Sequence, residues 1–498
     1  MSRSSRPVAR AARLLVAAAF VLPACTEGSR DAAPSPSVIT TTVSPSAGTS
    51  LSPSPSVPAT VSPTASPSSS APGAPSCAPA HAEPDPKRPV VSLRFAVADS
   101  KETVTGMERV TFTPDLPVDR LVFRLWANSP VPRRSGGSTR VTAVTVESRP
   151  ATFTPNGDGT LVTVPLGRTV APGTALGVQL DFTLTLPNGA NERLGHRGGV
   201  AWFGSGFPLL AWQRGRGWAT EPATSAFAEA ATSETFRLAS LEVDTAPGDV
   251  VLATGTPTDR DGPRVHRGAA EAVRDVMVTV GPLRVAQAYF EGGVVRVGVS
   301  PGLPDDPQRL VTLHLSALKR LSARFGKLGQ GLDVAVVPYL EGGVEFPGAI
   351  LLGSGQDRDA TLVHEVTHQW FYSLVGNNQA RDPWLDEALT TYAEALVSGT
   401  GSRYTSSSIP AAGRNRVGAP MTFWESRKSA YYRSVYVQGA AAMLRARATV
   451  GAQRFDAAFR CYVNANAHRI ATPADLRGAL APYPEAVAIL RRVGALPG

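Results

Sequence analysis

His364, Glu365 and His368 form an H-E-x-x-H pattern within the stretch TLVHEVTHQWFYSLVG. The apolar spacing of this stretch predicts a helix, with Gly376 as its C-terminal cap. Two histidines four residues apart share one face of a helix and can bind one zinc ion from adjacent turns. Glu365 is rotated by about 100° from His364, so it can reach a metal-bound water as the general base. The alternative is a pair of surface histidines on an ordinary helix.

A third metal ligand is available in the next apolar segment, WLDEALTTYAEALVSG. Asp382 and Pro383 predict the start of a helix that runs on to Gly399. Glu387, on this helix, completes a set of two histidines and one glutamate that leaves one position open for water. A hydrolytic zinc site requires that arrangement, and the sequence therefore predicts one Zn²⁺ ion.

Two other acids of the same predicted helix leave alternatives open. Asp386 is adjacent to Glu387 and could be the ligand in its place. Glu394 lies seven residues after Glu387, on the same face of the helix. It could support the site from behind a ligand, or it could have a solvated or structural role.

The elements that position these residues belong to a mostly helical region, residues 286–498. It opens with the strand-like run VVRVGVS, and Asp306-Pro307 then begins an amphipathic helix that extends to about Arg324. The run LDVAVVP follows as a buried strand, and several helices lead to the C-terminus. We expect this region to be the catalytic domain.

Residues 89–285 show short alternating runs instead. The clearest extends from Val178 to Leu186, with Val178, Leu180, Phe182 and Leu184 on one face and polar residues on the other. The sequence thus predicts an α+β multidomain protein, in which an all-β N-terminal domain precedes the mostly helical domain. Taken alone, the β region is equally consistent with a β-sandwich binding module.

The first 25 residues are typical of a signal peptide, with a basic leader, an apolar run and small residues before Cys25. Leu22-Pro23-Ala24-Cys25 resembles the bacterial lipobox, whose cysteine is acylated. Residues 26–88 are rich in Pro, Ser, Thr, Ala and Gly, so they predict a disordered linker. We therefore expect an extracytoplasmic protein, lipid-anchored to the bacterial cell membrane at Cys25; the alternative is an ordinary secreted protein.

Two cysteines remain after Cys25, and a secreted protein often pairs such a couple, so we predict a disulfide between Cys77 and Cys461. The net charge of +9 could favour anionic polymers or lipid head groups. No Lys/Arg cluster is interleaved with aromatic residues, and we expect no nucleic-acid partner.

The sequence resembles the gluzincin aminopeptidases of the aminopeptidase N family over about residues 90–498. The family signature is H-E-x-x-H, eighteen residues and Glu, and the interval from His368 to Glu387 has this length. Gly342-Gly343-Val344-Glu345-Phe346 stands where the family has its G-x-M-E-N motif, and Tyr436, in Tyr-Val-Gln-Gly, stands where the family has its catalytic tyrosine.

The resemblance implies a thermolysin-like catalytic domain and peptide substrates. Gly342, Gly343 and Glu345 would bind the substrate, with Glu345 on its free α-amine, and Tyr436 would stabilise the oxyanion. Tyr436 also stands at helical spacing from Tyr431 and Tyr432, which is typical of packing. Val344 and Phe346 replace the motif's Met and Asn, and Asp386-Glu387-Ala388 replaces the usual Asn-Glu-Gly.

The sequence therefore predicts zinc-dependent hydrolysis of peptide bonds, with an aminopeptidase as the first expectation. An endopeptidase or another hydrolase on the same scaffold is the nearest alternative. A non-catalytic surface binding lipoprotein is the alternative from a different class of protein.

Overall fold

The computed structural model describes residues 77–189, 193–225, 234–258 and 264–497. The predicted signal peptide with Cys25, and residues 26–76 of the predicted linker, lie outside the described residues. All described residues fall within one compact unit, Ser70–Gly498. No helix among them is both long enough and apolar enough to cross a membrane.

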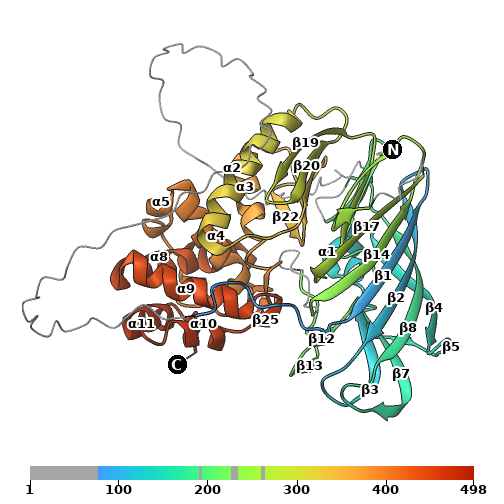
Figure 1. Ribbon diagram of the computed structural model, residues 1–498, viewed down its shortest axis with the longest axis horizontal. Helices are drawn as coiled ribbons and strands as arrows, with labels where there is room; N and C mark the ends of the chain where they lie inside the picture. The colour runs from blue at the N-terminus through green and yellow to red at the C-terminus, as the bar shows by residue number, and fades with distance from the viewer. Residues whose placement is uncertain (1–76, 190–192, 226–233, 259–263, 498) are drawn as a thin grey trace, which may run out of the picture. The chain divides into compact units, whose positions relative to one another are not determined.

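An eight-stranded sheet dominates the N-terminal half (Figure 1). Its order is β16 (Thr256–Pro257), β17 (Val265–Val273), β14 (Phe236–Asp244), β1 (Val90–Val97), β2 (Thr103–Phe112), β8 (Leu176–Thr185), β4 (Ser138–Val146) and β5 (Arg149–Pro150). In β8 the predicted alternation is confirmed, since Val178, Leu180, Phe182 and Leu184 are all buried. One face of the sheet therefore covers a hydrophobic core.

Two four-stranded sheets and a hairpin complete the β domain. One sheet has the order β15 (Val250–Ala253), β18 (Met277–Gly281), β10 (Val200–Gly204) and β9 (Leu194–Arg197). The other has the order β11 (Leu209–Leu210), β3 (Val118–Arg124), β7 (Leu161–Val170) and β6 (Thr154–Pro155). The hairpin pairs β12 (Trp212–Gln213) with β13 (Gly217–Trp218), and the short helices η1 (Trp126–Asn128) and α1 (Pro130–Arg134) follow β3. Side chains of all three sheets share one core.

A five-stranded sheet begins the second domain. Its order is β19 (Arg284–Phe290), β20 (Gly293–Val299), β21 (Leu332–Val336), β23 (Ala349–Leu352) and β22 (Gly343–Phe346). The pairs β20·β21 and β21·β23 are parallel, whereas β22 is an antiparallel edge strand. Helix α2 (Pro307–Phe325) lies against β19 and β20 (Figure 1), and the Asp306 side chain caps it by accepting from Gln308 N at 3.0 Å.

Helices make up most of the remainder of the chain. They are α3 (Arg358–Thr367), α4 (Trp384–Ser398), α5 (Gly401–Thr405), η2 (Ala411–Gly413), α6 (Met421–Trp424), α7 (Lys428–Tyr432), η3 (Arg433–Val437), α8 (Gln438–Val450), α9 (Ala452–Asn466), α10 (Pro473–Ala479) and α11 (Pro484–Arg492). A short parallel pair joins β24 (Val375–Asn377) to β25 (Arg469–Ala471). The predicted succession of an all-β domain and a mostly helical domain is confirmed.

The predicted helical cap at Gly376 is wrong. Helix α3 ends at Thr367, the chain then turns, and Gly376 lies within β24. A side chain at Gly376 would collide with the Arg274 guanidinium, which reaches in from the β domain and donates from Nε to Ser373 O at 3.4 Å. The glycine is required here because another side chain packs on its backbone, not because it ends a helix.

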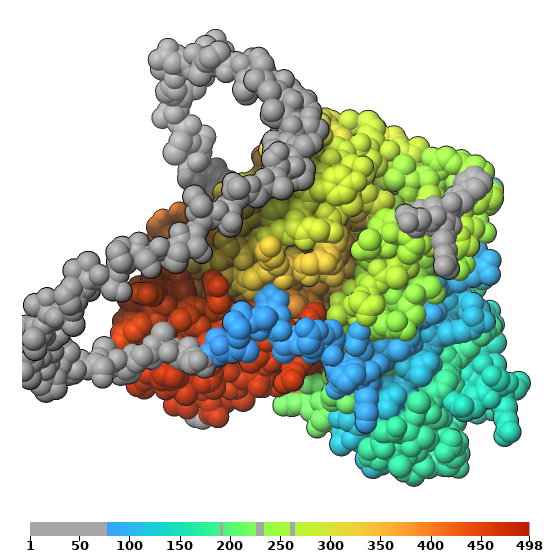
Figure 2. All heavy atoms as spheres, viewed as in Figure 1, coloured from blue at the N-terminus to red at the C-terminus, as the bar shows by residue number. Residues whose placement is uncertain are grey.

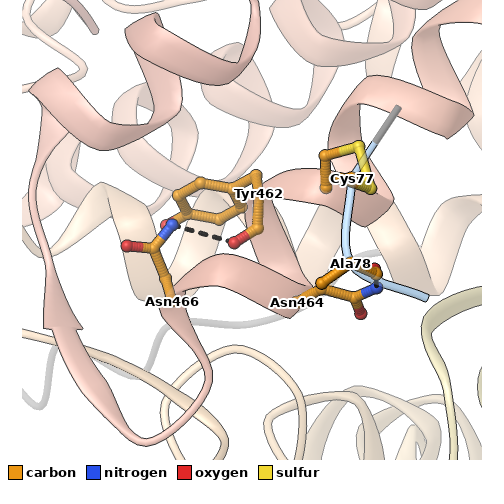
Figure 3. The surroundings of a disulfide bond; sticks show 6 residues. Cys77, Ala78, Tyr462, Asn464 and Asn466 are labelled. Atoms are coloured by element: carbon orange, nitrogen blue, oxygen red, sulfur yellow. Dashed lines mark hydrogen bonds between the residues drawn. A yellow bond between two sulfur atoms is a disulfide. The ribbon is translucent and has the colours of Figure 1, made fainter. Parts of the chain in front are cut away.

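Residues 77–88 lie on the folded body, although their composition is that of the linker. The structure contains the Cys77–Cys461 disulfide, which ties this segment to α9 (Figure 3). Asn464 Nδ2 donates to Ala78 O at 2.7 Å, and Ala82 N donates to Asn464 O at 2.8 Å. Figure 2 shows the segment, in blue, running over the C-terminal helices, in red. These bonds hold a segment that has few apolar residues of its own.

Candidate metal centre

Three side-chain atoms converge between α3 and α4. Nε2 of His364 and Nε2 of His368 are 3.1 Å apart, and each lies 3.4 Å from Oε2 of Glu387. A tetrahedral zinc ion with bonds of about 2.0–2.1 Å would separate its donors by about 3.3–3.4 Å. The three residues that the sequence predicts as ligands are therefore brought together at distances that fit one zinc ion.

The opposite nitrogen of each imidazole faces an acceptor. His364 Nδ1 lies 3.1 Å from Oε2 of Glu394, and His368 Nδ1 lies 3.0 Å from Phe371 O. Because a proton on Nδ1 leaves the lone pair on Nε2, both rings present that lone pair toward Glu387. Such contacts orient metal-binding histidines and raise their basicity.

The two acids left open by the sequence both lie behind a histidine. Asp386 Oδ1 is 2.8 Å from His368 Nδ1, on the far side of the ring from Glu387. Glu394 occupies the corresponding place behind His364, and its other oxygen accepts from the Tyr404 hydroxyl at 3.1 Å. Asp386 thus does not face the predicted zinc position, and Glu394 lies where it can support His364.

The charges of the protein groups around these donors favour a cation. Burial lowers the pKa of His364, but Glu387 and Glu394 outweigh burial and raise it to about 10. Burial raises the pKa of Glu387, but the two histidines outweigh it and hold that pKa below its ordinary range. Positive charge between these groups is stabilised in both cases, and a divalent ion can supply it in place of protons.

Glu365 lies beside the ligands without being one of them. Its side chain is buried, and Oε2 has no hydrogen-bond partner among the described residues. Burial raises the pKa of Glu365 to about 8, against the nearby histidines, which lower it. A cation close by would lower this pKa further, toward the neutral range in which a general base works best.

Strand β22 presents one face to Glu365 and the other to an apolar cluster that includes residues of the β domain. A Cβ at Gly343 would lie 2.5 Å from Glu365 Cγ, so this position needs a glycine. Glu345, two residues on, shares that face. Its carboxylate lies near the Glu365 carboxylate and the His368 imidazole, and Gln379 Nε2 donates to its Oε1 at 3.2 Å. Gly342 has φ +86° and accepts from Gly353 N, so it forms the turn before the strand.

The two residues that depart from the G-x-M-E-N motif point away from the metal centre. Val344 and Phe346 belong to a separate apolar cluster that includes Trp202 and Met277 of the β domain. A side chain at Gly204 would collide with the Phe346 ring. The substitutions therefore change packing between the two domains and leave the face that carries Glu345 unaltered.

Tyr436 lies in η3, a π-helical turn between α7 and α8. Its ring stacks on His364, with centroids 5.9 Å apart and 15° between the planes. Tyr431 is fully buried against Trp424, and Tyr432 is 37% exposed. The three tyrosines thus have different surroundings, and Tyr436 stacks on the predicted ligand His364.

Two residues of the centre have no signature in the sequence. Gln379 lies in the segment between β24 and α4, and Tyr404 lies in α5. Both reach the centre by hydrogen bonds to an acid that supports a histidine. Nothing in their spacing indicates this, because each contact depends on how separate elements pack.

Comparison with known proteins agrees with this geometry. Residues 352–491 match the family model of the peptidase family M1 domain. No curated protein matches the sequence. The structure is similar to that of an M1 zinc metallopeptidase of Deinococcus radiodurans, with a TM-score of 0.61 and 21% identity over 83% of this chain and 95% of that one.

Two further solved structures carry ligands. A mutant of the Deinococcus radiodurans enzyme bound to a Tyr-Ser-Ala substrate has a TM-score of 0.61 and 20% identity, over 83% of this chain and 96% of that one. A two-domain M1 zinc metallopeptidase mutant bound to L-arginine has a TM-score of 0.63 and 21% identity, over 83% and 95%. At this identity the likeness shows a shared fold. Residues 352–491 thus match the peptidase family M1 domain, and the described chain shares the two-domain fold of the M1 zinc metallopeptidases to which it is similar.

Proposed function

We propose that this protein is a zinc-dependent peptidase that removes residues from the free N-terminus of peptides. The observation that carries this proposal is the convergence of His364, His368 and Glu387 at 3.1–3.4 Å, with Glu365 buried beside them. The M1 family match and the peptide bound to a structural neighbour support peptide bonds as the substrate.

Zinc at this centre would supply a Lewis acid that polarises the peptide carbonyl and acidifies water. Glu365 accepts a proton from the attacking water and delivers it to the leaving amine. The Tyr436 hydroxyl donates to the oxygen that becomes negative in the transition state. The stacking of the Tyr436 ring on His364 supports this role. The buried surroundings of Glu365 strengthen these interactions.

Glu345 gives the proposed preference for a free N-terminus. Its carboxylate is buried on the same face of β22 as Gly343, which packs against Glu365. A buried carboxylate near the reacting bond stabilises an α-ammonium group and leaves an acetylated amine without compensation. Peptides with a free amine should therefore be cleaved, and N-acetylated copies rejected. Equal cleavage of both would favour the endopeptidase alternative.

The decisive test is Glu365→Gln, which keeps the shape of the side chain but removes the base. We expect one zinc ion per chain to remain, and kcat to fall by about 10²–10⁴-fold. Metal analysis and peptide turnover before and after chelation measure both quantities. Unchanged turnover would refute the role of Glu365, and a metal-free wild-type protein without turnover would favour a binding lipoprotein.

We also propose that the enzyme is held outside the cytoplasm by a lipid on Cys25. The support is the basic leader, the apolar run and the lipobox-like sequence that ends at this residue. Labelled fatty acid should be incorporated into the wild-type protein and not into Cys25→Ser. Equal incorporation in both would remove Cys25 as the site of the anchor.

A further inference from the structure

We infer that Gln379 is a positioning residue that links substrate recognition to the metal ligand His368. The inference rests on the proposed function. Gln379 is 2% exposed and lies in the segment between β24 and α4. Its Nε2 donates to Glu345 Oε1 at 3.2 Å and to Asp386 Oδ2 at 2.8 Å.

These bonds form part of a continuous buried path. The second oxygen of Asp386, Oδ1, lies 2.8 Å from His368 Nδ1, an ion-pair contact that is not aligned as a hydrogen bond. The path thus begins at the carboxylate proposed to hold the substrate amine and ends on a metal-binding ring. It crosses β22, the segment before α4, α4 itself and the end of α3, and all its members are at most 6% exposed: Glu345, Gln379, Asp386 and His368.

A neutral amide is well suited to the middle of this path. Its NH₂ group has two hydrogens, and each of the two carboxylates accepts one. Without these donors, two buried carboxylates would face each other with no donor between them, and their repulsion would move them apart. A displaced Asp386 no longer supports His368, and a displaced Glu345 no longer holds an ammonium group. Gln379 therefore affects both metal binding, through Asp386 and His368, and substrate recognition, through Glu345, while it contacts neither substrate nor metal.

The neighbouring residue offers a matched control. Asn378 is 1% exposed, and its Nδ2 donates to Gln213 Oε1 at 3.4 Å and to Glu221 Oε1 at 3.1 Å. It is thus an equally buried amide in the same segment, with hydrogen bonds to the β domain instead of the metal centre. Replacing either amide by an apolar side chain of similar size removes the two hydrogen bonds that its NH₂ group donates. Asn378→Leu also removes the bond that Asn378 Oδ1 accepts from Arg381 N at 3.0 Å, so this control is at least as disruptive.

The experiment compares Gln379→Met with Asn378→Leu in the full chain. Three quantities are measured: zinc affinity by competition with a chelator, kcat and KM for a peptide with free and acetylated N-terminus, and the melting temperature. For Gln379→Met we expect zinc affinity to fall by about 10–100-fold, as for other groups that support a metal ligand. KM for the peptide with a free N-terminus should rise by about tenfold or more, because the substrate ammonium loses its interaction with Glu345. Asn378→Leu should lower the melting temperature similarly and leave both other quantities near the wild-type values.

Equal changes of zinc affinity and KM in the two variants would overturn the inference, as would a folded Gln379→Met with wild-type values. If Gln379→Met does not fold, Gln379→Asn takes its place, because a side chain shorter by one methylene cannot reach both carboxylates. A wild-type enzyme that cleaves acetylated peptides equally well would contradict the proposed specificity. Zinc affinity would then still decide whether Gln379 supports His368 through Asp386.

Discussion

The β domain and the metal centre both bury glutamates, but they do so in different ways. Glu108, in β2, is 1% exposed, and neither of its carboxylate oxygens has a hydrogen-bond partner among the described residues. Burial raises its pKa well above the ordinary value. Glu387, in α4, is 4% exposed, and its pKa is lowered because two histidines outweigh the effect of burial.

The difference shows that burial alone does not mark a functional acid. Glu108 can be accommodated as a neutral acid, so the core buries a polar group but does not bury a charge. Glu387 is held as an anion by the same histidines whose nitrogens it faces. If the two histidines are to be neutral, as metal ligands must be, a cation has to supply the positive charge that keeps this buried carboxylate ionised, and this need distinguishes the centre from the core of the β domain.

The contrast between Glu387 and Glu108 is tested most strongly by the variant Glu387→Gln. We expect loss of zinc affinity beyond the 10–100-fold that follows removal of a group behind a ligand, because this variant removes a ligand itself. Turnover should fall in parallel and return in part with excess zinc. Glu102→Gln, at an exposed glutamate of the β domain, serves as the control. Full zinc occupancy in Glu387→Gln at low zinc concentration would contradict the assignment.

The convergence of the three predicted ligands could be predicted from the sequence because their geometry is local or nearly so. Four residues of helix place His364 and His368 on one face, and the segment that contains β24 returns the chain so that Glu387 in the next helix can face them. The period of two in β8 made the β domain predictable in the same way. In each case the pattern repeats with the period of one element.

Features that depend on packing between elements were not predictable. The cap expected at Gly376 is wrong because Arg274, about a hundred residues earlier, occupies the space beside that glycine. Val344 and Phe346 look like altered site residues in the motif, yet the pleat of β22 turns them toward the β domain. The position of Gln379 between two acids likewise follows from where β22 and α4 meet.

A smaller effect is expected at the acid behind the other histidine. Glu394→Gln replaces the anion that faces His364 Nδ1, so zinc affinity should fall by about 10–100-fold. Tyr404→Phe removes only the hydroxyl that donates to Glu394, and its effect on zinc affinity should be weaker in the same direction. Competition with a chelator measures the zinc affinity of both variants, and we expect the larger loss in Glu394→Gln. A larger loss in Tyr404→Phe than in Glu394→Gln would show that Tyr404 acts independently of the acid.

The smallest effect on activity is expected for Glu108→Gln, which should change stability alone. The folded protein keeps a proton on Glu108 that the unfolded chain releases above its ordinary pKa, so the wild type loses stability as pH rises toward the folded-state pKa. The loss is about 1.4 kcal/mol per pH unit while the two states differ by one proton. Glutamine cannot ionise, so the variant should be near the wild type in stability at pH 4 and more stable than it at pH 8. Chemical denaturation at the two pH values, with Glu102→Gln as the exposed control, measures the difference. A difference that does not change with pH would mean that Glu108 is already ionised in the folded protein, and the contrast with Glu387 would then be lost.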